Sequence, residues 1–290
     1  MKLIQGGLVK TITGGDIENG QILIDGGKIV AVGQNLDVPA GTEIIDAAGC
    51  IVTPGFVDAH CHIGMHEEAS RWEGNDTNEY SGPVTPEIRA IDGINPRDEA
   101  FGNAIGGGVT TAVTGPGSAN VLGGTFVAMK LYGDCVDDMI LKYPAAMKIA
   151  FGENPKGVYG QNGHKMPVTR MAVAATLRET LFKAQRYAKE IEEAEKDATK
   201  TRPFDMKLEA LLPERYDGEI LLPFFLEGGR YTIDNVHYVR EGDTLVPAGE
   251  TEFARDTTFA YRASDLTEWC QEKTGGAYPA EQVVSISLDE

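Results

Sequence analysis

Apolar and polar positions over the first 53 residues alternate in short runs, a pattern typical of strands rather than helices. The runs are rich in β-branched residues and lie at 8–12, 21–25, 28–32 and 43–46. Glycine, asparagine and proline turns separate them, and Asp25-Gly26-Gly27 predicts a hairpin. We therefore expect a small all-β module over residues 1–53.

The pattern changes after residue 53 to apolar strands that alternate with helices. Strands are expected at 50–59, 109–114 and 145–151, and helices at 96–104 and 169–200, with Thr169 as a cap. This alternation predicts a parallel α/β sheet or barrel. The runs 115–118 and 122–125 are interpreted as tight turns at its rim, where Ser118, Asn120 and Thr125 are candidates to contact a substrate.

The last part of the chain, from about residue 213, has a different residue pattern and composition. Strands are expected at 231–233 and 237–239, with a turn at Glu241-Gly242-Asp243. Residues 241–290 contain eleven acidic and three basic residues. We therefore treat 213–290 as a separate, unassigned acidic segment with predicted strands.

Composition narrows the classes of partner. The 290 residues carry a net charge of −18, which would repel nucleic acids and anionic membranes. No apolar run approaches the ~18 residues of a membrane span, and the N-terminus has no secretion-signal pattern. Four scattered cysteines fit a reducing compartment. We expect a cytoplasmic protein with a small-molecule substrate, no nucleic-acid or membrane partner, and scope for a homo-oligomer.

The candidate chemistry is a pair of histidines at the end of a predicted strand. His60 and His62 are two residues apart, so on a strand both side chains project to the same face. Two neutral imidazoles side by side can chelate a divalent ion. A His-x-His pair alone is as often a chance surface feature, but here Pro54-Gly55 and an apolar strand lead into it.

The run Pro54-Gly-Phe-Val-Asp-Ala-His-Cys-His62 resembles the first-strand signature of the metal-dependent amidohydrolase superfamily. Residues 1–53 resemble its N-terminal β-sandwich, and residues 107–113 its second barrel strand. Among its members, the imidazolonepropionase-related bacterial amidohydrolases are most similar. The resemblance covers residues 1 to about 212 and implies part of a (β/α) TIM-type barrel over 54–212. It also implies a divalent metal, with zinc favoured, held by His60 and His62.

The resemblance suggests a third metal ligand. Glu153 follows a predicted strand in a Gly-Glu-Asn-Pro turn and resembles the glutamate that bridges the metals in some amidohydrolases. Other members use a carboxylated lysine, for which Lys148 is the rival, although it lies inside the predicted strand. A solvated or helix-capping role for Glu153 is an equal alternative. His66 and His164 are expected in exposed loops, and His237 within a strand.

The family pattern then breaks. The resemblance implies histidines after the fifth and sixth barrel strands and an aspartate after the eighth, yet only His164 and His237 follow Glu153, and neither has the expected context. A full barrel also needs about 250 residues, more than residues 54–290 supply. We expect either a chain truncated or fused after Leu211-Leu212-Pro213, or a divergent replacement that packs on the N-terminal module.

Three functions follow from these features. The first is metal-dependent hydrolysis of a non-peptide C–N bond, in a cyclic amide or a related compound, with no general base identified and catalytic residues unknown. The second is an inactive amidohydrolase-like fragment or assembly partner. The third is a binding module formed by residues 213–290. Because a base is missing, we expect little or no hydrolysis by this chain.

Overall fold

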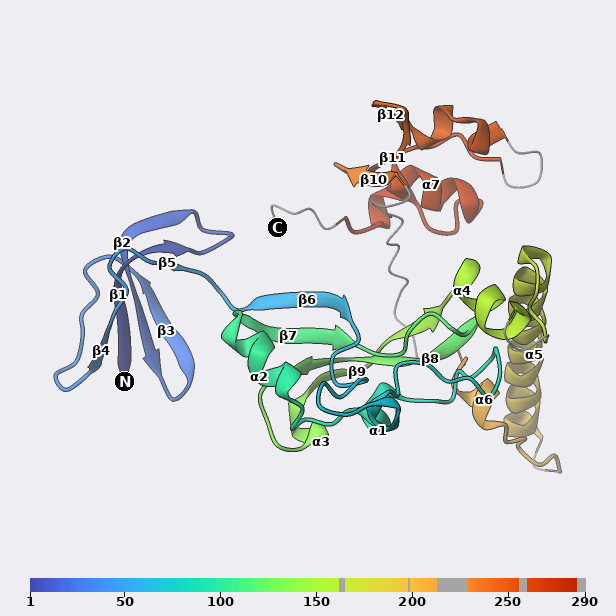
Figure 1. Ribbon diagram of the computed structural model, residues 1–290, viewed down its shortest axis with the longest axis horizontal. Coiled ribbons are helices and arrows are strands. Elements are labelled where there is room, and N and C mark those ends of the chain that lie inside the picture. Colours follow the sequence, from blue (N-terminus) through green and yellow to red (C-terminus); the bar gives the residue numbers. More distant parts are fainter. Residues whose placement is uncertain (162–164, 198, 213–228, 256–259, 286–290) are drawn as a thin grey trace. The chain divides into compact units, whose positions relative to one another are not determined.

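The structure is a computed structural model that describes residues 1–161, 165–197, 199–212, 229–255 and 260–285. Figure 1 labels the helices and strands. The chain divides into two compact units: Met1–Thr53 together with Ile220–Glu290, and Pro54–Glu219. In the described parts, no helix combines the length and apolar character needed to cross a membrane.

The N-terminal residues form a small sheet, as expected. Its strands are β1 (Lys2–Lys10), β2 (Asp16–Asp25), β3 (Lys28–Gly33), β4 (Glu43–Asp46) and β5 (Ile51–Val52), in the order β3-β2-β1-β4, with β5 also paired to β1. The predicted hairpin joins β2 to β3. Gly26 and Gly27 both have positive φ, at 55° and 77°, a conformation that glycine adopts without steric cost.

The central unit is built on a four-stranded sheet in the order β6-β7-β8-β9. Its strands are β6 (Phe56–Cys61), β7 (Val109–Thr114), β8 (Leu122–Lys130) and β9 (Ile140–Ile149). β6 and β7 are parallel, whereas β8 is antiparallel to both β7 and β9. The α/β class is thus confirmed, but the sheet is mixed, and a partial TIM barrel is not confirmed.

The interpretation of residues 122–125 as a rim turn is wrong, because they begin β8. The glycines there permit close packing rather than a turn: a Cβ atom on Gly124 would lie 2.3 Å from the Ile88 carbonyl oxygen. A glycine inside a strand often marks such a close approach of another backbone. The Gly-Gly pair has the composition of a turn, and for this reason the sequence-based prediction was wrong here.

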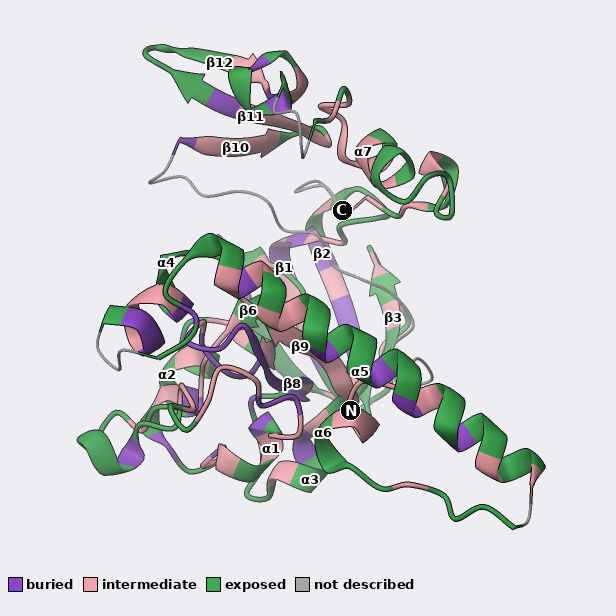
Figure 2. Ribbon diagram, turned by 90° about the vertical axis from the view of Figure 1, so that its right-hand side faces the viewer, coloured by how far each residue is buried: buried purple, intermediate pink, exposed green. Residues whose placement is uncertain are grey.

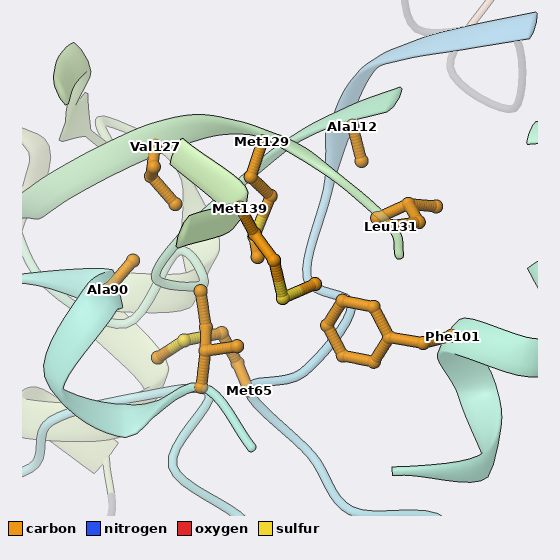
Figure 3. Packing of buried hydrophobic residues seen from close by; sticks show 9 residues of the cluster. Met65, Ala90, Phe101, Ala112, Val127, Met129, Leu131 and Met139 are labelled. Atoms are coloured by element: carbon orange, nitrogen blue, oxygen red, sulfur yellow. The ribbon is translucent and has the colours of Figure 1, made fainter. Parts of the chain in front are cut away.

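A hydrophobic core covers one part of this sheet. It is formed with α1 (Ala90–Gly93), α2 (Glu99–Gly106) and α3 (Val136–Met139). Figure 3 shows the buried side chains of these helices and of β7 and β8 gathered in one cluster. The cluster comprises Met65, Ala90, Ile94, Phe101, Ala112, Val127, Met129, Leu131 and Met139.

The predicted long helix is confirmed as α5 (Arg170–Lys196), and Thr169 Oγ1 caps it by accepting a hydrogen bond from the Ala172 amide at 3.1 Å. Its buried residues, Val173, Thr180, Ala184, Tyr187 and Ile191, recur every three to seven positions on one face (Figure 2). Shorter helical segments in this unit are Trp72–Gly74, α4 (Glu153–Pro155), the π-helix Lys156–Gln161 and α6 (Met206–Glu209).

The C-terminal segment contains the predicted strands. β10 (Arg230–Ile233), β11 (Val236–Glu241) and β12 (Thr244–Pro247) form an antiparallel sheet in that order, and α7 (Leu266–Lys273) follows. Short 3₁₀ turns lie at Ala248–Glu250, Glu252–Arg255 and Ala280–Gln282. The predicted junction after Leu212 falls at residues 213–228, which lie outside the described residues.

Candidate functional site

The two candidate histidines lie side by side at the end of β6. The entry to this strand needs a glycine, because a Cβ atom on Gly55 would lie 2.2 Å from Thr110 Oγ1 at the start of β7. The strand then places His60 near its end and His62 directly after it. Their ring centroids are 5.3 Å apart, and the rings meet edge to face at 76°.

His62 is oriented by a backbone carbonyl. Its Nδ1 lies 2.7 Å from the carbonyl oxygen of Gly115, just beyond β7. Because a carbonyl can only accept, Nδ1 carries a proton, so Nε2 is the ring nitrogen left to act as a ligand. Histidines that bind metals commonly hold their second nitrogen in this way.

The ring of His60 stacks on an aromatic ring and lies beside a lysine. Its ring stacks on Phe126 of β8, with centroids 5.4 Å apart and planes at 19°. Its Nε2 lies 3.3 Å from Nζ of Lys148, which comes from β9 and lies 5.8 Å from the Phe126 ring centroid. The two histidines, Phe126 and Lys148 therefore bring β6, β8 and β9 together at one place.

The electrostatics favour neutral groups here. Partial burial of the ring lowers the pKa of His60; the nearby Lys148 and His62 lower it further, while Asp58 acts in the opposite direction. Burial also lowers the pKa of the Lys148 ammonium. Desolvation disfavours the charged form of both groups, so the unprotonated, ligand-competent form of His60 is favoured.

Glu153 does not join this cluster. It is the first residue of α4, its side chain is 78% exposed, and its carboxylate binds Nζ of Lys156 at 2.8 Å. That ion pair lowers the pKa of Glu153. Within the described ranges, no group of three or more His, Cys, Asp or Glu side chains is arranged to hold a metal ion. The prediction of Glu153 as third ligand is therefore not supported, because Lys156 engages its carboxylate.

Lys148 occupies the position beside His60 that was expected for Glu153. Sequence reasoning set Lys148 aside as a residue inside the strand, but β9 ends at Ile149, one residue later. The missed signal was the position of the strand end. A side chain one residue before that end still reaches His60 of β6, although β7 and β8 lie between the two strands in the sheet order.

The remaining histidines lie elsewhere or outside the described residues. His66 is exposed and forms an isolated bridge with Asn75. His237 lies on β11, as expected, with Nδ1 3.2 Å from Thr232 Oγ1. His164 falls among residues 162–164, which the structure does not describe.

Two of the three residues considered for substrate contact serve the fold instead. Asn120 is fully buried, and its Nδ2 donates to the carbonyl oxygens of Glu79 and Gly82 at 3.0 and 2.8 Å. Thr125 is also buried, with Oγ1 2.8 Å from the Tyr143 hydroxyl. These contacts hold the loop after residue 78 and β9 against β8. Ser118 is partly buried, and its role stays a prediction.

The donor set can be compared with what a divalent ion requires. Two neutral imidazoles, one of them fixed through Nδ1, are suitable ligands for zinc. An ammonium group at Lys148 is not a ligand, since all its electron pairs are in bonds. Lys148 fits the set only as a neutral amine or after carboxylation, so the residues present provide part of a metal site.

Comparisons with known proteins agree with the first-strand motif. Amidohydrolase tasK of Hapsidospora irregularis is 34% identical over 182 residues, which cover 57% of this chain and 18% of that protein. The D-hydantoinase of Geobacillus stearothermophilus is 48% identical over 64 residues, 22% of this chain and 13% of that protein. A solved amidohydrolase from Thermotoga maritima MSB8 is 40% identical, with a TM-score of 0.68 over 72% of this chain and 54% of the solved chain.

The C-terminal part has a different likeness. A family model described as a sugar-binding N-terminal domain matches residues 172–289. The chain spans less than a fifth of the length of these two curated relatives and about half of the solved Thermotoga maritima chain. Over a partial segment, the chain matches the amidohydrolase superfamily.

Proposed function

We propose that the cluster around His60 and His62 is the metal-binding part of a hydrolase site for non-peptide C–N bonds, in a cyclic amide or related small molecule. The relatives are hydrolases that act on C–N bonds, including an amidohydrolase and a hydantoinase. Because the chain spans only part of their length, we propose weak activity for the chain alone. An inactive, assembly-dependent form is the alternative.

The observation that carries this proposal is the hydrogen bond from His62 Nδ1 to the Gly115 carbonyl oxygen, at 2.7 Å. It fixes both the tautomer and the ring orientation, so that Nε2 is available beside His60. A surface pair without function would need no such orientation. Gly115 is also required locally, since a Cβ atom there would lie 2.5 Å from the Phe126 ring.

The roles of the residues follow from this geometry. A divalent ion at such a site supplies a Lewis acid and lowers the pKa of a bound water toward ~7. His60 and His62 would hold the ion, and Phe126 shields the His60 ring from water on one side. Lys148, after carboxylation of its neutral amine, would replace Glu153 as the third ligand. We assign no general base, whose lack costs about 10²–10⁴-fold in rate.

The test is zinc binding by the purified chain, measured by titration calorimetry and by metal analysis after dialysis. His60→Ala and His62→Ala should each abolish tight binding of one zinc ion. His66→Ala, an exposed histidine a few residues away, is the matched control and should leave binding unchanged. Unchanged stoichiometry in His60→Ala would refute the site.

Activity is tested with hydantoins, dihydropyrimidines and lactams. We expect little turnover by the chain alone. Metal-dependent turnover that is lost in His62→Ala would show that the described residues or the C-terminal segment provide a base that the geometry does not reveal. Such a result would keep the C–N hydrolase assignment and remove the expectation of weak activity.

A second candidate function, sugar binding, concerns the C-terminal segment. The family match over 172–289 is accompanied by an open pocket of about 520 Å³, lined by polar and charged residues together with Val239 and Phe253. The guanidinium of Arg230 lies 5.3 Å from the centroid of the Phe253 ring in this cavity. Titration with a panel of aldoses and sugar acids tests it: Phe253→Ala should abolish binding, and Tyr278→Ala, an exposed aromatic residue outside the cavity, should not.

A further inference from the structure

The Gly115 carbonyl that orients His62 belongs to a loop with a rigid, buried centre. The carbonyl is part of the peptide group that joins Gly115 to Pro116, and the side chain of Pro116 is fully buried. The proline ring fixes the φ angle of its own residue. The direction of the Gly115 carbonyl therefore depends on where the next residues, 117–119, are held.

Thr77 and Asn78 hold these residues at two points. The Gly117 amide donates to the Thr77 carbonyl oxygen at 2.6 Å, and the Ala119 amide donates to Asn78 Oδ1 at 3.0 Å. The Asn78 side chain also lies directly on the backbone of Gly117, because a Cβ atom there would lie 2.5 Å from Asn78 Oδ1. Asn78 thus fixes the loop through a hydrogen bond and through close packing.

The loop in turn fixes the segment that carries Asn78. The carbonyl oxygen of Glu79, the next residue, accepts a hydrogen bond from Asn120 Nδ2 at 3.0 Å and one from the Tyr159 hydroxyl at 2.8 Å. Asn120 is fully buried. Two asparagine side chains, one on each segment, therefore hold the backbone of the opposite segment.

The same segment is also attached to the backbone that follows His62. Thr77 Oγ1 donates to the Met65 carbonyl oxygen at 3.2 Å, and the Met65 amide donates to the His62 carbonyl oxygen at 3.0 Å. The two partners of the hydrogen bond between His62 and Gly115 are therefore both linked to Thr77 and Asn78. A change at Asn78 would move one partner relative to the other.

We propose that Asn78 is a positioning residue for the candidate site. By fixing residues 117–119, it holds the Gly115 carbonyl against His62 Nδ1 and keeps the proton on that nitrogen. Nε2 then stays available to a metal ion. An asparagine that served only stability would leave the position of this proton unchanged. The inference rests on the proposed function, but its effect on the His62 ring requires no metal.

The experiment is two-bond ¹H–¹⁵N NMR of the full chain with ¹⁵N-labelled histidine, without metal. The pH is set about two units above the ordinary histidine pKa of ~6.5, so that the rings are neutral. His62→Gln identifies the His62 signals, which should show the proton on Nδ1 in the unaltered chain. Asn78→Leu removes the acceptor at nearly constant size and should lower the Nδ1-protonated fraction at least about twofold. An unchanged fraction in Asn78→Leu overturns the inference.

Matched variants separate positioning from stability. Asn78→Asp keeps an acceptor oxygen and should retain the tautomer. Asn95→Leu is the control, because Asn95 is also partly buried and its Oδ1 accepts a hydrogen bond from the Arg97 amide at 3.1 Å. Gly117→Ala would displace Asn78 Oδ1, so it should reproduce the shift and serves if Asn78→Leu does not fold. An equal shift in Asn95→Leu overturns the inference.

Zinc titration of the same proteins separates this inference from the proposed function. Asn78→Leu should bind zinc about 10–100-fold more weakly than the unaltered chain, the loss expected for a residue that supports a metal ligand. Asn95→Leu should bind it normally. A tautomer shift in a chain that binds no zinc supports the role of Asn78 and refutes the metal site. Zinc binding that depends on His60 but not on Asn78 overturns the inference and leaves the proposed function in place.

Discussion

β8 and β6 belong to the same sheet but differ sharply in their surroundings. Seven of the nine residues of β8 are buried, whereas no residue of β6 is. β8 has a strand on either side, and β6 has one neighbour in the described residues. Among the described residues, this sheet is thus paired on both sides where it contributes most to the core and on one side where its histidines lie.

The difference has a physical basis in the residues themselves. Residues of β8 and of the strand next to it enter the hydrophobic core, together with residues of α1, α2 and α3. Apolar burial of this kind stabilises a fold by about 25 cal/mol per Å² removed from water. Phe56 and Val57 have the same apolar character but contribute little of it while exposed. The strand that contributes most to stability, β8, is therefore not the strand that carries the candidate histidines, β6.

The largest expected effect is a difference in stability between two phenylalanine variants, one in the core and one on β6. Phe101, at 3% exposure in the core, and Phe56, at 55% on β6, are the same residue in opposite surroundings. Phe101→Ala should lower the free energy of unfolding by about 3–5 kcal/mol. Phe56→Ala should cost clearly less, at most about 2 kcal/mol, because more than half of its surface is already exposed. Urea unfolding measures both, and equal losses would contradict the proposed separation.

A second experiment tests how much the hydrogen bonds of the buried Asn120 contribute to stability. Its Nδ2 is within hydrogen-bond distance of the Glu79 and Gly82 carbonyl oxygens and of the hydroxyl of Tyr159. Asn120→Ala should cost about 1–3 kcal/mol of stability, since buried acceptors lose a donor. Asn154→Ala, at an exposed position, is the control and should leave the unfolding midpoint in place.

A third experiment concerns the site at the end of β6 and compares the two candidate third ligands, Lys148 and Glu153. If Lys148 is a carboxylated ligand, Lys148→Met should weaken zinc binding about 10–100-fold, a loss comparable to that for removing a residue that supports a metal site. Added bicarbonate should strengthen binding by the unaltered chain and leave Lys148→Met unaffected. Glu153→Gln is the control and should bind zinc normally, because its carboxylate is paired with Lys156. Tighter binding by Lys148→Met would mean that Lys148 stays an ammonium group and repels the ion.

Local sequence patterns were sufficient for much of the fold. The strands around Asp25-Gly26-Gly27 and the cap at Thr169 depend on neighbouring residues only, and both are confirmed. β8 was missed because Gly123 and Gly124 have the composition of a turn. Gly124 is required instead by its close tertiary packing against Ile88, which no local pattern reveals.

The candidate site divides in the same way. The strand parity of His60 and His62 was visible in the sequence, and the rings are neighbours. The position of Lys148 beside His60 was not, because it depends on the order of β6 and β9 in the sheet and on the Phe126 ring between them. The place of Lys148 beside His60 also depends on where β9 ends, and strand ends are the least certain part of a sequence-based prediction.

The smallest expected effect extends the comparison to a histidine outside the central sheet. Burial lowers the pKa of His237 on β11, and the charge of Arg230 lowers it further. In the unfolded chain this histidine titrates near 6.5, so between that value and the lowered pKa the unfolded state binds more protons. Stability therefore falls as the pH drops through this window and is retained above it.

Trp269 on α7 reports unfolding of the C-terminal segment in a Trp72→Phe background. His237→Gln should give a shallower loss of stability from pH 7 to pH 5 than the unaltered chain. An identical pH dependence in the two proteins would show that His237 is already solvated in the folded state.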